Sequence, residues 1–81
     1  MTIKVKFFAI AREKAGTGEA ILHLPDDATV AGAAVQIARQ FPGLAATAAK
    51  CAIAVNQEYA ASDRRLRDGD ELALIPAVSG G

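Results

Sequence analysis

Residues 2–10 read Thr-Ile-Lys-Val-Lys-Phe-Phe-Ala-Ile, and their apolar side chains alternate with lysines at the start of the stretch. A period of two residues is typical of a β-strand, because successive side chains in a strand point to opposite faces. The pattern therefore predicts a strand over residues 2–10 with one buried side, and the other elements have to be placed around it. The buried face carries Ile3, Val5, Phe7 and Ala9, and the outer face carries Lys4, Lys6, Phe8 and Ile10.

Further elements follow along the chain. Thr29 is a good helix N-cap, and the apolar positions after it repeat every 3.6 residues until Pro42-Gly43 stops the helix. Asn56-Gln57 and Asp68-Gly69-Asp70 are typical of turns. Residues 44–50 are alanine-rich and fit either a short second helix or an irregular connection. In chain order, the predicted elements are a helical turn at 11–15, a strand at 20–24, a helix at 30–41, a strand at 51–56, a short return strand at 58–60 and a last strand at 71–75.

This order of elements places one main helix between two groups of strands. One helix can cover one face of a mixed sheet of four or five strands, in which the first and last strands are neighbours at the centre. The arrangement is the β-grasp or ubiquitin-like fold, a two-layer α+β architecture. We therefore expect one β-grasp domain over residues 1–76 and a flexible tail over residues 77–81.

Length and charge exclude several classes of protein. The chain has 81 residues, of which 52% are hydrophobic and 22% charged, as is typical of a single folded domain. Its formal net charge of +0 argues against a general nucleic-acid binder, whose affinity depends on an excess of cations. It contains no apolar run of about 18 residues that could span a membrane. Since no leader-like segment precedes the first strand, we expect a cytoplasmic protein.

The usual catalytic and metal-binding patterns are missing from the sequence. His23 is the only histidine and Cys51 the only cysteine, so neither has the companions that a metal site or acid–base catalysis needs. We expect both to be structural, with Cys51 on the core-facing side of its strand. The acidic residues around Asp68 and Asp70 are typical of a solvated turn. The sequence therefore predicts no metal site.

The sequence ends in Ser79-Gly80-Gly81. Two residues without a Cβ atom can lie extended in a channel that is too narrow for other residues, and they leave a terminal carboxylate unhindered. This ending fits a tail that presents its own carboxylate to the active site of another protein. A frayed tail without a function is the alternative.

Apolar side chains also point away from the predicted core. Phe8 lies on the outer face of the first strand, and Ala73 and Ile75 lie on the outer face of the last strand. If these two strands pair at the centre of the sheet, the three side chains form a flat apolar patch, with Tyr59 nearby and alanines on the outer face of residues 51–56. Exposed apolar patches are typical of protein-binding surfaces. The alternative is that a loop of the chain itself covers Phe8.

Several short motifs are spread in order along the chain. They are Phe7-Phe8-Ala9, Arg12-Glu13, Gly16, Thr29-Val30, Ala54-Val55-Asn56-Gln57, Leu66, Asp68-Gly69-Asp70-Glu71, Pro76 and Val78-Ser79-Gly80-Gly81. Together they resemble the sulfur-carrier small subunits of molybdopterin synthase, the MoaD family. Gly32, which stands where the family has an acidic residue, and the alanine-rich residues 45–49 depart from the family pattern, and both bear only on helix stability.

The resemblance implies a β-grasp fold and a mechanism. A separate E1-like adenylating enzyme uses ATP to adenylate the carboxylate of Gly81, and sulfur then displaces AMP to leave a thiocarboxylate. The chain docks on the large catalytic subunit in a hetero-oligomer and donates this sulfur to the pterin precursor of the molybdenum cofactor, while Gly80 keeps the tail slender. It would bind no cofactor and have no turnover of its own. The expected partner contacts are Phe8, Tyr59, Ala73, Ile75, Pro76 and Val78.

Three other functions remain open at the level of the sequence. A sulfur carrier of thiamine thiazole synthesis would share the fold, the acidic turn and the two terminal glycines. A ubiquitin-like modifier would use the same adenylate to form isopeptide bonds to lysines of other proteins. In a purely structural interaction domain, the final Gly80-Gly81 would be accidental.

Overall fold

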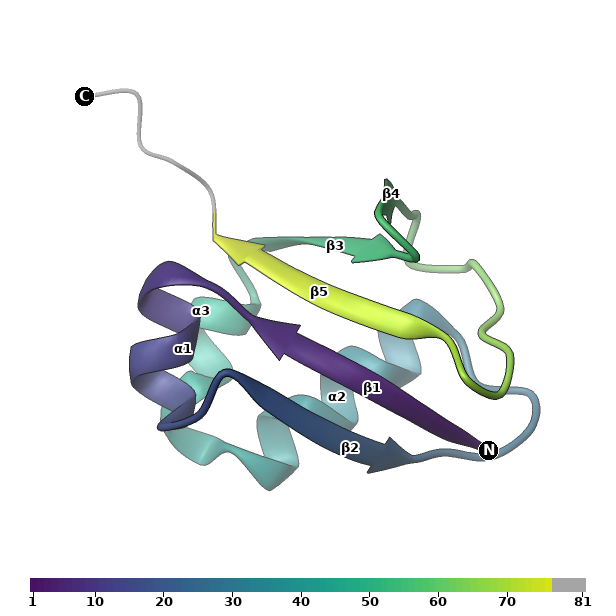
Figure 1. Ribbon diagram of the computed structural model, residues 1–81, viewed down its shortest axis with the longest axis horizontal. Coiled ribbons are helices and arrows are strands. Elements are labelled where there is room, and N and C mark those ends of the chain that lie inside the picture. The colour runs from purple at the N-terminus through teal and green to yellow at the C-terminus, as the bar shows by residue number, and fades with distance from the viewer. Residues whose placement is uncertain (77–81) are drawn as a thin grey trace.

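A computed structural model describes residues 1–76, which form both helices and strands (Figure 1). The elements are β1 (Thr2–Phe7), α1 (Ala9–Ala15), β2 (Glu19–His23), α2 (Val30–Gln40), the 3₁₀ helix η1 (Pro42–Leu44), α3 (Ala45–Ala48), β3 (Cys51–Val55), β4 (Glu58–Tyr59) and β5 (Glu71–Pro76). The predicted residues 77–81 of the tail lie outside the described residues, so the flexible tail and the domain boundary at residue 76 stay predictions.

The strands of the described residues form one sheet in the order β2-β1-β5-β3-β4. β1 pairs with β2 in an antiparallel hairpin, and it pairs with β5 in parallel, with Val5 opposite Leu72. β5 in turn pairs antiparallel with β3. The first and last described strands therefore lie side by side at the centre, as Figure 1 shows, and the predicted mixed sheet is confirmed.

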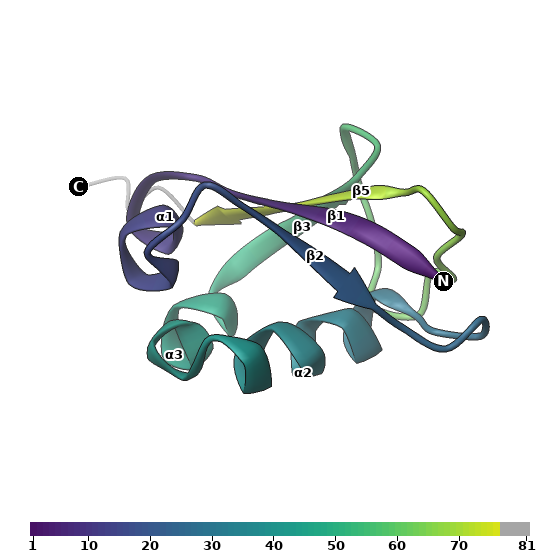
Figure 2. The same cartoon turned by 60° about the horizontal axis from the view of Figure 1, so that its bottom comes forward.

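The main helix covers one face of this sheet. Figure 2 shows α2 and α3 beneath the strands, while the opposite face of β1, β5 and β3 carries no helix. The side chains between the two layers form the core, and the ring of Phe7 packs edge-on against Phe41 with 5.2 Å between ring centroids. The larger core residues are Ile3, Val5, Phe7, Leu22, Leu24, Val30, Ile37, Leu44, Val55, Leu66, Leu72 and Leu74. The α+β β-grasp architecture expected from the sequence is confirmed.

The end of β1 differs from the sequence prediction. The strand stops at Phe7 rather than Ile10, and α1 begins at Ala9, two residues earlier than expected. The reason is that Ala9 has a φ of 50°, in the left-handed region, which breaks the alternation and turns the chain into the helix. Ala9 is consequently exposed, although the alternation placed it on the core-facing side.

The main helix begins where the sequence predicts. The Thr29 hydroxyl oxygen accepts a hydrogen bond from the Gly32 N–H at 3.3 Å, which satisfies one of the free donors of the first turn. After α2, residues 42–48 form η1 and α3 in succession, so the first of the two options for residues 44–50, a short second helix, is the one observed. None of the helices in residues 1–76 is long and apolar enough to cross a membrane.

Candidate functional site

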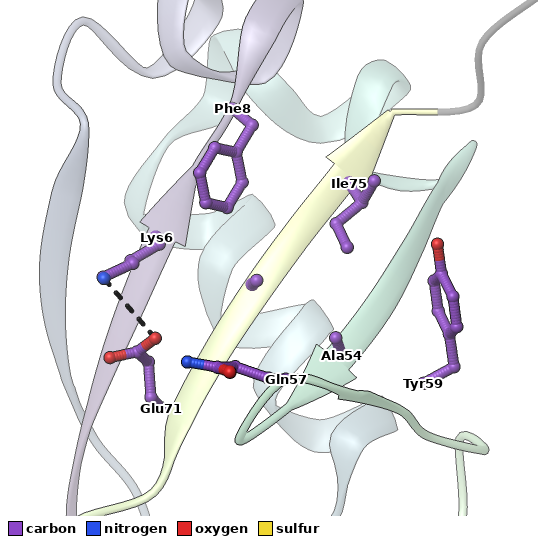
Figure 3. A pocket seen from close by; sticks show the side chains of 8 residues that line it. Lys6, Phe8, Ala54, Gln57, Tyr59, Glu71 and Ile75 are labelled. Carbon is purple, nitrogen blue, oxygen red and sulfur yellow. Dashed lines mark ion pairs between the residues drawn. The ribbon is translucent and has the colours of Figure 1, made fainter.

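A hollow of about 360 Å³ opens on the uncovered face of the sheet, over β1, β5, β3 and β4 (Figure 3). Its side chains come from strands that are far apart in the sequence, and the sheet order brings them together. The apolar lining residues are Phe8, Ala54, Tyr59, Ala73 and Ile75, and the polar ones are Lys6, Gln57 and Glu71.

The hollow exists because its floor consists of alanines. Ala73 on β5 lies opposite both Lys6 on β1 and Ala54 on β3, and Ala54 lies opposite Tyr59 on β4. Short side chains at the centre of a sheet face leave a depression wherever the surrounding side chains are long. Ala54 faces outward, as the sequence pattern indicates, but its larger neighbours leave it buried.

Phe8 stands at the rim of this hollow, beside the end of β5 that carries Ile75 (Figure 3). Its backbone is still extended, with φ −122° and ψ 152°, so it continues the outward side of the β1 alternation before Ala9 turns the chain. The side chain is 47% exposed, so no loop within residues 1–76 covers it. The predicted apolar patch therefore lies on the surface of the protein.

The turn between β3 and β4 is fixed by hydrogen bonds to the start of β5. Asn56 and Gln57 have φ values of 51° and 71°, as predicted for a tight turn in which asparagine tolerates a positive φ. The Asn56 side-chain amide donates to Asp70 at 3.0 Å, and its oxygen accepts from the Glu71 N–H at 3.0 Å. These bonds hold Gln57 and β4 beside the hollow.

Asp70 anchors the second turn that borders the site. Its carboxylate accepts the Arg67 N–H at 2.7 Å in addition to the Asn56 amide. Partial burial alone would raise the pKa of Asp70, but the hydrogen bonds from Arg67 and Asn56 and the charges of Arg64 and Arg67 outweigh it and lower that pKa. Asp68 and Gly69 are exposed, as expected of the solvated turn that the sequence predicts, and Asp70 stabilises this turn through its hydrogen bonds.

An ion pair closes one end of the hollow. The Lys6 Nζ lies 3.5 Å from the Glu71 Oε1, and in Figure 3 this pair and Gln57 lie together at the end opposite Phe8 and Ile75. The sequence analysis did not select Lys6, Gln57 or Glu71 as partner contacts. The signal for Lys6 was present, since the β1 alternation places it on the same outer face as Phe8.

The structure brings together four of the residues that the sequence selected for partner contacts. Phe8, Tyr59, Ala73 and Ile75 all line the hollow. Pro76 is partly buried at the end of β5, opposite Cys51, and does not line it. The remaining selected residues, Val78, Gly80 and Gly81, lie outside the described residues.

The contacts of Cys51 and His23 fit the structural roles that the sequence predicts for them. The Cys51 Sγ donates to the Thr47 carbonyl oxygen at 3.2 Å, and burial raises the pKa of the thiol, so the neutral form is favoured. His23 lies exposed on β2, with its Nδ1 3.4 Å from the Thr2 hydroxyl. Among residues 1–76, no three His, Cys, Asp or Glu side chains cluster in a way that could hold a metal ion.

Solved structures with the same architecture extend over nearly the whole chain. SAMP1 from Haloferax volcanii is 31% identical, with a TM-score of 0.92 and 100% of both chains covered. A putative molybdopterin converting factor subunit 1 from Pyrococcus furiosus is 31% identical, with a TM-score of 0.89, over 96% of this chain and 99% of that one. In a complex of subunits 1 and 2 of the molybdopterin-converting factor from Helicobacter pylori, the similar chain is 27% identical, with a TM-score of 0.71 and 100% of both chains covered.

Curated relatives match over the full length as well. A molybdopterin synthase sulfur carrier subunit from Chlamydomonas reinhardtii is 42% identical over 83 residues, which cover 100% of both chains. The subunit of that name from Escherichia coli is 42% identical over 81 residues, which cover 98% of this chain and 99% of the relative. The model of the ThiS family matches residues 5–81. A β-grasp sheet with this apolar hollow, full-length relatives and a family match over almost every residue together show that the chain belongs to the ThiS family.

Proposed function

We propose that the chain is the sulfur carrier subunit of a molybdopterin synthase, and that it acts in the cytoplasm, where the ATP that adenylation consumes is available. The curated relatives of that name, at 42% identity over the full chain, support this function. The proposal assigns two tasks to different parts of the molecule. The folded residues bind partner proteins, and the carboxylate of Gly81 carries the sulfur.

The chemistry requires that this carboxylate be activated first, because a carboxylate is a poor electrophile. One carboxylate oxygen of Gly81 attacks the α-phosphorus of ATP, and pyrophosphate leaves. A sulfur nucleophile at the oxidation level of sulfide then attacks the carbonyl carbon, the bond from that carbon to the AMP oxygen breaks, and AMP leaves. The product is a thiocarboxylate on Gly81. The ATP site and the acid–base groups belong to the E1-like partner, so this chain holds no cofactor and is a protein co-substrate.

The observation that carries the proposal is the position of the apolar hollow relative to the end of β5. The hollow lies against this strand, and Pro76, its last residue, directly precedes the five residues that end in Gly80-Gly81. Five residues span at most about 17 Å, so the proposal requires the active site of a partner seated in the hollow to lie within that distance of Pro76. Binding of the folded domain to such a partner therefore also delivers Gly81 to the partner's active site.

The proposed partner in the second step is the large catalytic subunit of the synthase. The similar chain from Helicobacter pylori is part of a complex of subunits 1 and 2 of the molybdopterin-converting factor, which supports a hetero-oligomer. In the proposed hetero-oligomer of this chain, the thiocarboxylate sulfur bonds to a carbon of the pterin precursor as a carbon–oxygen bond of the precursor breaks. Water then cleaves the acyl C–S bond and restores the Gly81 carboxylate, and two such transfers complete the dithiolene. Phe8, Tyr59 and Ile75 supply the apolar contacts of the docked chain.

A reconstituted reaction tests the proposal. The chain is incubated with its adenylating enzyme, ATP and sulfide, and thiocarboxylate is measured by intact mass. The control is a variant with one alanine appended after Gly81, which keeps the hollow intact and displaces the carboxylate. We expect thiocarboxylate on the native chain only, with equal affinity of both chains for the large subunit. Equal loading of both chains, or no loading of either, contradicts the proposed role of Gly81.

A second candidate function is that of a protein modifier. The likeness to SAMP1, whose Haloferax volcanii form is also described as small archaeal modifier protein 1, favours it. A modifier would form isopeptide bonds between Gly81 and lysines of other proteins. Isolation of the tagged chain from its own cells under denaturing conditions separates the two functions, because a modifier accumulates in higher-mass conjugates and a carrier does not.

A further inference from the structure

The hollow has an apolar end and a charged end. Phe8 and Ile75 lie at one end, and the ion pair between Lys6 and Glu71 lies at the other, as Figure 3 shows. The side chains of the pair are only 35% and 33% exposed. Glu71 and Ile75 are four positions apart on β5, so the two ends are about 13 Å apart along the strand.

Lys6 and Glu71 can each form more hydrogen bonds than the single contact between them uses. The Lys6 ammonium has three N–H groups and the Glu71 carboxylate has two oxygens, whereas a single contact of 3.5 Å joins them. Within residues 1–76, neither side chain takes part in another ion pair. Water therefore has to satisfy the remaining groups on the free protein. A partner that fills the hollow removes this water, and it must replace the lost bonds or bear a desolvation cost.

Apolar contact alone does not set the orientation of a bound partner, because the hydrophobic effect is non-directional. Charged groups at one end of an apolar surface do set it, since a wrong orientation places like charges together or leaves a charge unpaired. We propose that the Lys6–Glu71 pair is the orientation determinant of docking on the large subunit. This inference rests on the proposed function. This orienting role requires a partner surface with an apolar side chain over Ala73 and Ile75. The same surface must place a hydrogen-bond acceptor against Lys6 and a hydrogen-bond donor against Glu71.

The consequence of this orientation is the direction in which the chain leaves the hollow. The pair lies at the start of β5 and Pro76 at its end, so fixing the first fixes the direction of the strand on the partner. Residues 77–81 follow Pro76 in the sequence, so the direction of β5 on the partner decides on which side of the interface they begin. A chain docked the other way round would bury the same apolar area with β5 pointing in the opposite direction.

The sheet itself supplies a matched control. Lys4 and Glu19 form a second lysine–glutamate pair on the uncovered face, between β1 and β2, with 3.9 Å between the Lys4 Nζ and the Glu19 Oε2. Their side chains are more exposed, at 46% and 59%, and neither lines the hollow. In the sheet register Lys4 lies opposite Glu71 and Glu19 lies opposite Lys6, so exchanging the charges of one pair alone would set like charges opposite each other. Replacing both members of a pair with glutamine avoids this.

The experiment replaces both charged residues of each pair with glutamine in the full-length chain. The variants are Lys6→Gln/Glu71→Gln and, as the control, Lys4→Gln/Glu19→Gln. Each is measured for Tm, for Kd with the large subunit of the same organism, and for the single-turnover rate of sulfur transfer from preformed thiocarboxylate at saturating large subunit. Both double replacements preserve net charge and remove one partly exposed ion pair, so we expect Tm within about 5 °C of the native chain.

For the pair in the hollow, we expect Kd, the transfer rate or both to worsen by at least about tenfold, since the partner groups that face Lys6 and Glu71 then lose their charged counterparts. For the control, we expect less than about threefold in both quantities. An effect smaller than tenfold in both quantities for the pair in the hollow overturns the inference, as does an equal effect of the control. If Lys6→Gln/Glu71→Gln unfolds the protein, the single replacement Glu71→Gln is judged by the same limits. A native chain that does not bind the large subunit refutes the proposed function itself.

Discussion

Replacement of Phe8 with alanine removes an exposed aromatic ring at the rim of the hollow. Phe8 is 47% exposed, and a phenylalanine has on the order of 200 Å² of surface, so a docked partner has roughly 90 Å² of it left to cover. At about 25 cal/mol per Å², this area is worth about 2 kcal/mol. Since each 1.4 kcal/mol corresponds to about tenfold in Kd, Phe8→Ala should weaken binding of the large subunit roughly thirtyfold.

Isothermal titration calorimetry with the purified large subunit measures this loss, and Ile21→Ala is the matched control. Ile21 is 48% exposed and lies on β2, on the same uncovered face, but outside the hollow. It should change Kd by less than about twofold, because the partner leaves it in water. A loss below about threefold for Phe8→Ala, or an equal loss for Ile21→Ala, would refute the placement of the docking surface.

Three further predictions concern the frame around the hollow. Asp70→Asn should lower the free energy of unfolding at pH 7 by about 1 kcal/mol, because it weakens the hydrogen bonds to Arg67 and Asn56. Since folding lowers the pKa of Asp70, its stabilising effect is present above the unfolded pKa of about 3.9 and is lost as the pH falls through the folded value. Urea titrations at pH 7 and pH 3 should therefore show a smaller difference between native and variant chains at pH 3, and a constant difference would disprove this role. Ala9→Gly should raise the free energy of unfolding by up to about 1 kcal/mol, because glycine adopts a φ of 50° without strain, and a loss of stability would contradict that strain. Thr29→Ala should cost about 1 kcal/mol through the lost cap on Gly32, with binding of the large subunit unchanged, and an unchanged urea midpoint would show that the cap contributes nothing.

The period of two residues in β1 is why so much of the site could be predicted. Once Ile3, Val5 and Phe7 are buried, a strand has to place Phe8 on the other face, and the same rule applied to β5 places Ala73 and Ile75 outward. The central pairing of β1 and β5 follows from the element order of the fold. Phe8, Ala73 and Ile75 therefore come together without any information from side-chain geometry.

Features that depend on register or on unusual dihedral angles could not be predicted in this way. The Lys6–Glu71 pair is a diagonal contact, since Glu71 lies opposite Lys4 and Lys6 lies opposite Ala73. Which residue faces which in a parallel pair has no signal in either strand alone. Ala9 likewise carries no mark of a positive φ, because alanine is an ordinary residue in both helices and strands, whereas the asparagine of the turn at Asn56 is such a mark.

The most direct test of the central claim is the intact mass of the chain purified from its own cells, after deletion of the gene for the large subunit so that loaded carrier accumulates. The claim predicts a species heavier by about 16 Da, the difference between sulfur and oxygen, with the extra mass located on Gly81 by fragmentation. The shift should disappear when the adenylating enzyme is also deleted. An unshifted mass in cells that contain the adenylating enzyme, or a mature chain that continues past Gly81, would contradict the claim.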